Sequence, residues 1–418
     1  MRVLVSAIAC RPDLGSEARV GWNAVNAIAK QHECHVVTHV EGRAAIEKAQ
    51  AQGEAAGVNF HYCGNAFRWH PSRFIARLQS WMLYRKWQAA ILPDAMQLHR
   101  RHRFDLVHHV TYVTWRMAPR LWQMPVPFVW GPIGGASNID RPFLNTLSPS
   151  ARAFEIVRCV SGLRESRSSA FRRCARHASF IIAAEEQTAS FMARHAPSTK
   201  IGTLCPVFFT QEQLNQLNKA GTRRQPQEWP LRIFAGGNLE GRKGIAIALR
   251  ALSLLKDAGA SFTYTIGGAG PELPAMRELA LSLGLNDVVT FHNGYAGTEY
   301  ADRLRASDIY LLPSVRETAG ITMMEAVLAG CYPIVMAHTG AGEIIERIGC
   351  RPLIAANPAE AVERVAQELE WCHKNRSAMI ERATEAGRRL GAHFSEQRYL
   401  DTINGIYSEA VSVYPRSE

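Results

Sequence analysis

The sequence lacks the signals of a secreted, zinc-bound or membrane-spanning protein. Its nine cysteines are scattered, odd in number and without a C-x-x-C pair, which argues against a disulfide framework and against a zinc site. The opening MRVLVSAIAC has too short an apolar run for a signal peptide. No uninterrupted apolar run approaches the ~18 residues that a membrane-spanning helix needs. We therefore expect a cytoplasmic protein with reduced cysteines.

Signatures of two further classes are also missing. No G-x-G-x-x-G follows the first predicted strand, because Gly15 stands alone and the later GGAGPEL lacks a third glycine, so a dinucleotide oxidoreductase is disfavoured. The net charge of +11 would suit a basic nucleic-acid-binding protein, but the chain has no zinc-finger, basic-zipper or RNA-recognition signature. We therefore expect no nucleic-acid partner and keep a basic nucleic-acid-binding protein only as the alternative function.

The positive charge is concentrated in two segments. Residues 68–103 hold eight Lys or Arg against one Asp, and residues 152–176 hold seven Arg against two Glu. Such segments suit nucleic acid, anionic lipid or phosphorylated substrates. Each can equally be an ordinary solvated face of a helix.

The amino-acid composition and the alternation of predicted strands and helices are typical of an α/β enzyme. The chain has 418 residues, of which 47% are hydrophobic and 20% charged, as in a soluble globular protein of two to four domains. MRVLVSAIA predicts a strand, residues 17–30 a helix and CHVVTHV a second strand, and the pattern resumes at FDLVHHV and VPFVW. A doubly wound parallel sheet is the simplest architecture for this order.

A polar stretch with two prolines, QEQLNQLNKAGTRRQPQEWP at 211–230, predicts a linker between two such domains. After it, the alternation of strand and helix restarts at LRIFAGG and continues to CYPIVMA. The predicted fold is therefore α/β, with two Rossmann-like domains that face a central cleft. Ligands of such sheets bind beyond the carboxyl ends of the strands.

The segment GGNLEGRKGIAIALRAL is suited to bind a diphosphate. Glycines follow a predicted strand, Arg242 and Lys243 lie in the loop, and an apolar helix begins at once. Backbone N–H groups, a helix N-terminus and two cations together bind phosphates well. The alternative is a plain turn with incidental surface cations.

The segment PSVRETAGITMMEAVLAG places two glutamates eight positions apart. Glu317 is expected in a loop beside the amides of Gly320 and Ile321, and Glu325 on the helix that follows. A carboxylate accepts two hydrogen bonds from a vicinal diol, so the pair can hold one diol of a ribose and one of a sugar. The alternative is a pair of surface glutamates on an ordinary helix.

Four segments of the second half are informative together and follow one another in this order: GGNLEGRKG, TIGGAGPEL, ASDIYLLPSVRETAGITMMEAVLAGCYPIV and TGAGEII. On these segments, within 231–345, the chain resembles the retaining family 4 glycosyltransferases, which have the two-domain GT-B fold and a Glu-x7-Glu motif. The tail FSEQRYLDTINGIY is similar to the family's closing helix, which crosses back to the first domain. The resemblance implies an acceptor-binding domain over 1–215, a nucleotide-sugar-binding domain over 216–390 and a closing helix over 391–418.

The resemblance also implies roles for individual residues. The implied donor-binding residues are Gly15, Gly237, Arg242, Lys243, Glu317, Gly320, Ile321 and Glu325. Arg242 and Lys243 would neutralise the departing nucleotide diphosphate, Glu325 would bind the ribose, and Glu317 would bind hydroxyls of the donor sugar. Gly15, in LGSEARVGW, would present its amide to the diphosphate from the other domain.

Two adjacent histidines leave one assignment open. DLVHHVTY corresponds to a strand whose end carries a histidine near the transferred sugar in many family members, and His109 is the choice over its neighbour His108. A histidine at a strand end is as often structural as catalytic. VWGPIGGASN could likewise bring the amides of Gly134 and Gly135 to the cleft, or form a plain tight turn.

The implied reaction is retaining transfer of a hexosyl group from GDP-mannose or a UDP-hexose. None of the nine aspartates lies two positions from another, so the D-x-D motif that carries a divalent ion in other glycosyltransferases is absent. The Arg242 and Lys243 pair would take over its electrostatic task. We expect metal-independent activity with no cofactor. A nucleotide-sugar epimerase with the same two-domain fold is the alternative enzyme.

The acceptor is predicted as a glycan or a polyprenyl-diphosphate-linked glycan in bacterial surface polysaccharide assembly. In RWHPSRFIARLQSWMLYRKWQAAIL, aromatic residues alternate with cations at helical spacing. Such a helix can lie on an anionic membrane and would make the enzyme peripheral on the inner face of the cell membrane. The alternative is a core helix with a cationic outer face. The aromatic residues concerned are Trp69, Phe74, Trp81, Tyr84 and Trp87.

Overall fold

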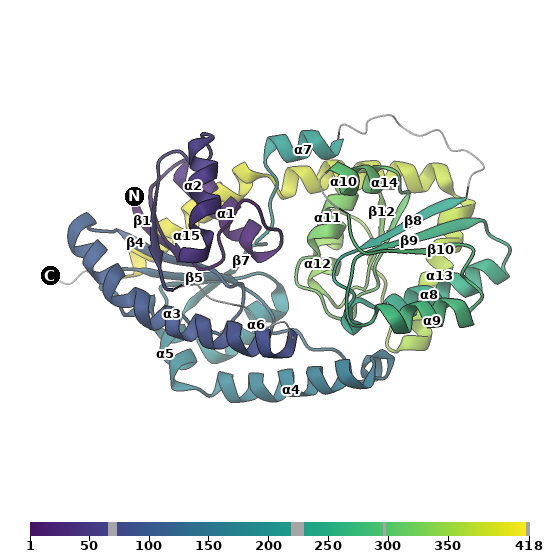
Figure 1. Ribbon diagram of the computed structural model, residues 1–418, viewed down its shortest axis with the longest axis horizontal. Coiled ribbons are helices and arrows are strands. Elements are labelled where there is room, and N and C mark those ends of the chain that lie inside the picture. Colours follow the sequence, from purple (N-terminus) through teal and green to yellow (C-terminus); the bar gives the residue numbers. More distant parts are fainter. Residues whose placement is uncertain (66–72, 219–229, 296–297, 415–418) are drawn as a thin grey trace. The chain divides into compact units, whose positions relative to one another are not determined.

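The computed structural model describes residues 1–65, 73–218, 230–295 and 298–414 (Figure 1). The chain divides into two compact units. Unit 1 comprises Met1–Ala136, Ser161–Val207 and Glu396–Glu418, and unit 2 comprises Ser137–Val160 and Phe208–Ser395. Unit 2 thus includes a stretch of the first half of the chain, Ser137–Val160, which we call the insert.

Unit 1 is built on a seven-stranded parallel sheet in the order β3-β2-β1-β4-β5-β6-β7. Its strands β1 and β5 are mostly apolar, as is typical of a parallel sheet that helices cover on both faces. The strands are β1 Arg2–Ala7, β2 Glu33–His39, β3 Val58–Cys63, β4 Leu106–Thr111, β5 Phe128–Ile133, β6 Phe180–Ala183 and β7 Lys200–Thr203.

The helices of unit 1 include the last helix of the chain, which contacts β5 and β6. The helix α4, Pro149–Ser166, begins in the insert and ends in unit 1. The other helices are α1 Glu17–Ala29, α2 Arg43–Ala51, α3 Arg73–His102, α5 Ser169–His177, α6 Glu186–His195 and α15 Glu396–Val413.

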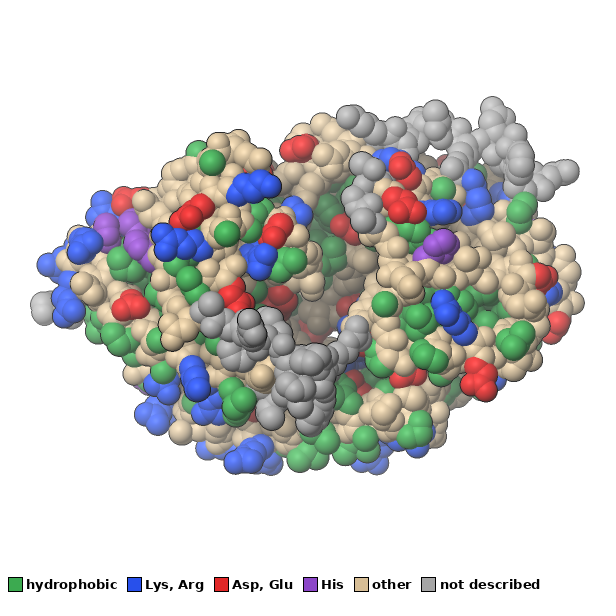
Figure 2. Space-filling model, viewed as in Figure 1, with side chains coloured by type: hydrophobic (Ala, Val, Ile, Leu, Met, Phe, Trp, Pro, Cys, Tyr) green, Lys and Arg blue, Asp and Glu red, His purple; other side chains and the backbone are tan. Residues whose placement is uncertain are grey.

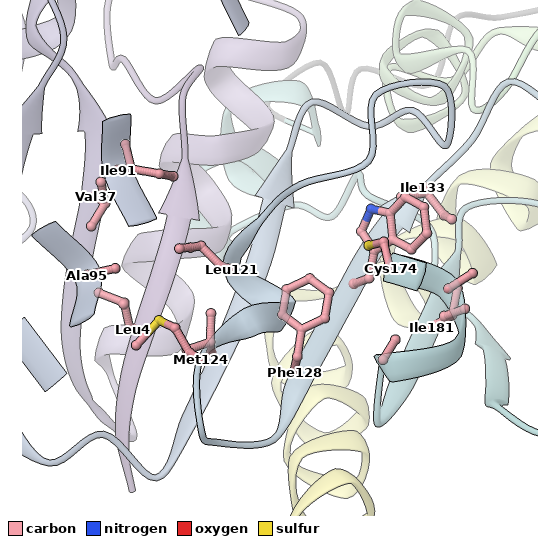
Figure 3. Close-up of a cluster of buried hydrophobic side chains, with 14 of the residues drawn as sticks. Leu4, Val37, Ile91, Ala95, Leu121, Met124, Phe128, Ile133, Cys174 and Ile181 are labelled. Carbon is pink, nitrogen blue, oxygen red and sulfur yellow. The ribbon is translucent and has the colours of Figure 1, made fainter. Parts of the chain in front are cut away.

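One cluster of buried hydrophobic side chains in unit 1 lies between the sheet and the helices α3, α5 and α6 (Figure 3). From α3, Ile91 and Ala95 pack toward Leu4 and Val37 of the sheet (Figure 3). Tyr84 and Trp87 of α3 are also fully buried in this cluster.

The burial of α3 corrects part of the expectation that its aromatic residues lie at a membrane interface. Tyr84 and Trp87 belong to the core, because they occupy the same helical face as Ile91. Trp81 is exposed, as a surface residue would be. Trp69 and the side chain of Phe74 lie outside the described residues.

Unit 2 is built on a five-stranded parallel sheet in the order β10-β9-β8-β11-β12. The two doubly wound parallel sheets confirm the predicted α/β class. The strands are β8 Leu231–Gly236, β9 Phe262–Gly267, β10 Val289–His292, β11 Ile309–Leu311 and β12 Tyr332–Ile334. The helices are α7 Gln211–Asn218, α8 Ile245–Asp257, α9 Leu273–Ser282, α10 Thr298–Arg305, α11 Ile321–Leu328, α12 Gly340–Arg347, α13 Pro358–Lys374 and α14 Arg376–His393.

The predicted linker is partly helical. Its first eight residues form α7, which contacts α11 of unit 2. Leu214 of α7 is buried, and Arg305 Nη1 of α10 donates to the carbonyl of Gln216 at 3.1 Å, so both contacts help to dock this short helix. Residues 219–229 of the predicted linker lie outside the described residues. In the described parts of the chain, no helix combines the length and the apolar character that crossing a membrane requires.

Candidate active site

The candidate site of unit 2 lies where the strand order of its sheet reverses. The strands β8 and β11 are neighbours, with β9 on the far side of β8 and β12 on the far side of β11. Loops that leave such neighbouring strands at their carboxyl ends diverge and leave a crevice for a ligand. Arg242 and Lys243 follow β8, in the short helix η4 Gly241–Lys243, and Glu317 follows β11.

Glu317 is held by both cations of the loop after β8. Its Oε2 accepts hydrogen bonds from Lys243 Nζ and, at 3.3 Å, from Arg242 Nη1. Burial alone would raise the pKa of Glu317, but the charges of Lys243 and Arg242 outweigh it and lower the pKa to about 2. Lys243 is only 8% exposed. The two loops therefore meet in a charged cluster that is nearly closed to water.

A glycine allows the two loops to approach this closely. Gly244, directly after Lys243, adopts a left-handed conformation with φ of 68°. A Cβ atom at this position would collide with the carbonyl oxygen of Pro313 in the loop after β11. Val315 N–H donates to the carbonyl of Arg242 at 2.9 Å and fixes the same approach through the backbone.

The loop after β11 ends at the N-terminus of α11, where Gly320 is the N-cap with φ of 67°. The first N–H groups of a helix have no acceptor within the helix, and the helix dipole favours an anion there. The predicted amides of Gly320 and Ile321 therefore lie at the start of α11, three and four positions after Glu317.

Glu325 lies one turn along α11 and has a tyrosine partner. Tyr300 of α10 donates its hydroxyl hydrogen to Glu325 Oε2 at 3.1 Å. Burial, and then the Glu325 carboxylate, raise the pKa of Tyr300 far above its usual range, so Tyr300 stays a donor. The structure thus orients one oxygen of Glu325 through a neutral hydroxyl group. The sequence pattern did not single out Tyr300.

The residues of this site lie within a segment of the chain that matches a known protein family. The model of that family, described as glycosyl transferases group 1, matches residues 223–386. Residues 223–386 are thus similar to the group 1 glycosyl transferases, and we call them the group 1 segment. The predicted resemblance to glycosyltransferases is thereby confirmed for this segment.

Relatives and solved structures extend the likeness beyond this segment. The chain is 29% identical over 175 residues to the putative colanic acid biosynthesis glycosyltransferase WcaL of Salmonella typhimurium, covering 40% of this chain and about two fifths (42%) of that relative. It is 27% identical to the 2-deoxystreptamine glucosyltransferase of Streptomyces kanamyceticus, over 67% of this chain and 71% of that one. Anabaena HepE, solved in complex with UDP-glucose, has the same fold, with a TM-score of 0.61, 14% identity and 99% of each chain covered.

A second group of charged residues supports the loop of the group 1 segment that carries Glu317. Arg316 Nη2 donates to Glu155 Oε1 at 2.6 Å, and Arg158 Nε donates to Glu155 Oε2 at 2.7 Å. Burial opposes ionisation of Glu155, but Arg316 and Arg158 hold its pKa below its usual range. Arg242 joins this group because its Nη1 donates to the carbonyl of Arg316 at 3.1 Å. One network therefore links Glu155 to Glu317.

The insert that carries Glu155 also touches two other loops of the group 1 segment. Ser148 Oγ donates to Glu272, in the loop after β9, at 2.6 Å. Leu147 and Ala151 lie so close to Gly241 that a Cβ there would touch both. The insert thus contacts the loops after β8, β9 and β11. Sequence reasoning missed Glu155, because 161 positions separate it from Arg316 and no local pattern joins them.

The predicted histidines of unit 1 are buried in β4. His109 is 1% exposed, with Nδ1 3.0 Å from Ser6 Oγ and Nε2 3.1 Å from the Tyr84 hydroxyl. His108 Nδ1 lies 2.7 Å from the Tyr407 hydroxyl of α15. Burial lowers the pKa of His109 to about 3 and that of His108 to about 4. This geometry favours structural roles, and the catalytic role of His109 stays a prediction.

The remaining predicted glycines fall in both units. Gly15 is exposed in the loop before α1, and a Cβ there would meet no neighbouring atom. Gly135, after β5, has φ of 86° and donates its N–H to Glu185 Oε1 at 3.3 Å, while the Gly134 carbonyl accepts from Trp115 N–H at 3.4 Å. Gly237, directly after β8, is the one of these that belongs to unit 2.

Proposed function

We propose that the protein is a retaining, metal-independent glycosyltransferase that moves a hexosyl group from a nucleotide-diphosphate sugar to a hydroxyl of a glycan or lipid-linked glycan. The observation that carries the proposal is the buried contact of Lys243 and Arg242 with Glu317 at the switch point of the group 1 segment. A relative named for colanic acid biosynthesis and a structural neighbour solved with UDP-glucose support the polymer and donor classes.

Lys243 and Arg242 would stabilise the charge of the departing diphosphate. The bond between the anomeric carbon and the diphosphate oxygen breaks, and the acceptor oxygen bonds to the same face of that carbon. The acceptor proton leaves with the diphosphate oxygen, so charge balances without an added base. Cations held in place before the reaction stabilise the developing negative charge more than mobile ones, because they need no reorganisation.

Glu317 and Glu325 would hold two parts of the donor. Glu325, with one oxygen oriented by Tyr300, accepts hydrogen bonds from the ribose diol. Glu317 lies between the cations and the start of α11, where the amides of Gly320 and Ile321 can meet a phosphate oxygen. Its carboxylate then accepts from hydroxyls of the hexose.

The proposal is tested by a thermal-shift panel with UDP, GDP, ADP and their sugar conjugates, each with and without EDTA. A ligand at 100 times its dissociation constant stabilises the folded state by about 2.7 kcal/mol. A shift with one base, unchanged by EDTA and absent from a Lys243→Ala variant, would support the donor site. EDTA that abolished turnover would contradict metal independence, and no shift with any nucleotide would contradict the donor site itself.

We further propose that the enzyme works at the inner face of an anionic membrane, where a polyprenyl-diphosphate-linked acceptor is available. Four large apolar side chains on one face of α4 are exposed: Ile156 by 51%, Val157 by 64%, Val160 by 61% and Leu163 by 58%. Figure 2 shows hydrophobic and basic side chains along the edge where Figure 1 draws α4. A helix with an apolar face and cations nearby suits an anionic bilayer surface.

A further inference from the structure

Unit 1 contains a hollow that none of the donor-site residues lines. It has a volume of about 390 Å³ and lies between α3, the segment 116–123 and the start of α5. Its size falls within the roughly 300 to 1,000 Å³ that small-molecule sites occupy. Four of its lining residues are arginines, namely Arg85, Arg116, Arg120 and Arg173.

The charge of this hollow is strongly positive. Among the described residues that line it, Glu165 is the one carboxylate, and it accepts a hydrogen bond from Ser168 Oγ at 3.1 Å. Four guanidinium groups against one carboxylate attract an anion. Guanidinium groups also match the geometry of phosphate oxygens, because each offers parallel N–H donors.

Neutral neighbours hold three of these arginines in place. Arg173 Nη2 donates to Ser169 Oγ at 3.4 Å, and the guanidinium of Arg85 stacks 4.6 Å from the centre of the Trp81 ring. The Arg120 amide donates at 2.9 Å to Oε1 of Gln88, which is only 2% exposed. These contacts restrict the side chains or the backbone without neutralising the charge.

The start of α5 adds backbone donors to the same hollow. Ser168 caps the helix by accepting from Phe171 N–H at 3.1 Å. Ser169 and Ala170, which also line the hollow, carry the first N–H groups of the helix, and these have no intrahelical acceptor. The positive end of the helix dipole lies at this position.

We infer that this hollow binds a phosphate or diphosphate group, with Trp81 and Trp122 against the part of the ligand next to the phosphate. All of its residues belong to unit 1, so the site stands independently of the donor site in unit 2. Within the proposed function, the ligand class is the diphosphate of a lipid-linked acceptor. The same chemistry is offered by a membrane headgroup and by a free phosphate ester.

The site is tested by calorimetric titration of inorganic pyrophosphate into the full-length chain. The pocket variant is Arg85→Gln with Arg173→Gln, two positions that are exposed at the surface. The matched control is Arg172→Gln with Arg176→Gln, which removes the same charge from exposed positions of α5 outside the lining. A third variant, Lys243→Ala, removes one of the two donor-site cations.

We expect the pocket variant to bind pyrophosphate at least about tenfold more weakly at one site, because two charged donors are lost. The control and Lys243→Ala variants should retain that site. Equal weakening in the control variant would show a general charge effect and overturn the inference, as would unchanged binding in the pocket variant. Pyrophosphate binding that is lost only in the Lys243→Ala variant would also overturn the inference, because the bound anion would then be at the donor site.

A second arm identifies the source of the phosphate. Phosphatidylcholine vesicles with and without phosphatidylglycerol are floated with wild type, the pocket variant and the control. Flotation on the anionic vesicles that is lost only in the pocket variant assigns the site to a lipid headgroup. Pyrophosphate binding without this loss excludes a membrane headgroup and is the result expected for the diphosphate of an acceptor or for a soluble phosphate ester. A pair of lysines, Arg85→Lys with Arg173→Lys, should recover part of the pyrophosphate affinity, and its failure to do so in a folded protein would contradict the charge-based account.

Discussion

At the scale of single residues, Glu325 is the side chain whose removal tests ribose binding most directly. Glu325→Ala should cost about 1.5 to 3 kcal/mol of donor binding, or ten- to a hundredfold in affinity, because it removes a charged acceptor of two hydrogen bonds. The dissociation constant of the nucleotide diphosphate measures this. Tyr300→Phe, which removes only the hydroxyl group that orients Glu325, is the graded control and should weaken binding less. Normal nucleotide binding by the Glu325 variant would refute the assignment.

Glu17, in the first turn of α1, makes stability depend on pH. Its Oε1 accepts from Val113 N–H at 3.0 Å, its Oε2 is buried without a hydrogen-bond partner among the described residues, and burial raises its pKa to about 7. Because the pKa of Glu17 is higher in the folded protein than in the unfolded chain, where it is about 4.3, the protonated side chain favours folding. This contribution is full below about pH 4.3 and is lost as the pH rises through 7.

The Glu17→Gln variant keeps the hydrogen-bond acceptor for Val113 and cannot ionise. We expect its free energy of unfolding to be close to that of wild type near pH 4 and to exceed it by roughly 3 to 4 kcal/mol at pH 8, because only wild type must ionise a buried carboxyl group. Urea unfolding at both pH values measures the difference. Parallel pH profiles for the two proteins would show that Glu17 does not titrate in this range.

At the scale of helices and loops, the insert is predicted to hold the loop of Glu317 in place. Glu155→Gln leaves Arg316 and Arg158 without their shared carboxylate, and breaking a buried ion pair from one side costs about 3 to 5 kcal/mol. We expect a lower free energy of unfolding together with a lower kcat, because the backbone of Arg316 adjoins Glu317. Glu363→Gln, on an exposed position of α13, is the matched control and should change neither.

A double-mutant cycle separates this positioning role from general destabilisation. If Glu155 acts through Arg316, the loss of unfolding free energy in the double variant Glu155→Gln with Arg316→Gln should be smaller than the sum of the losses in the two single variants. Strict additivity of the three variants in both unfolding free energy and kcat would mean that the two side chains act separately.

The same loops show what could be predicted from the sequence. The local patterns of strand, loop and helix place Arg242, Lys243, Glu317 and Glu325 just after two predicted strands. That these strands, β8 and β11, are neighbours comes from the structure. Glu155 and Tyr300 reach the site from other elements, and their contacts depend on tertiary packing that no period of two or 3.6 residues encodes. The polar segment before residue 219 is predicted as a linker for a related reason: its helix α7 docks through tertiary contacts, such as the burial of Leu214, that the local pattern does not show.

At the scale of the whole molecule, the exposed apolar face of α4 predicts how the protein meets a membrane. We expect it to float with vesicles that contain phosphatidylglycerol, because Leu163 and its three apolar neighbours can enter the headgroup region while Arg164 and Arg167 meet the anionic lipid. Added salt should weaken this binding, since the cations contribute through a screened interaction.

Replacing Ile156, Val157, Val160 and Leu163 by Ser should reduce partitioning by at least about tenfold, because each side chain loses a buried apolar contribution of the order of 1 kcal/mol. The control is the pair Leu281→Ser and Ile354→Ser in unit 2, whose side chains are 66% and 77% exposed. All six positions are exposed, so neither set should unfold the protein. Equal loss in both sets would mean that exposed apolar area in general drives flotation, and no loss in the α4 set would remove this helix from the membrane contact.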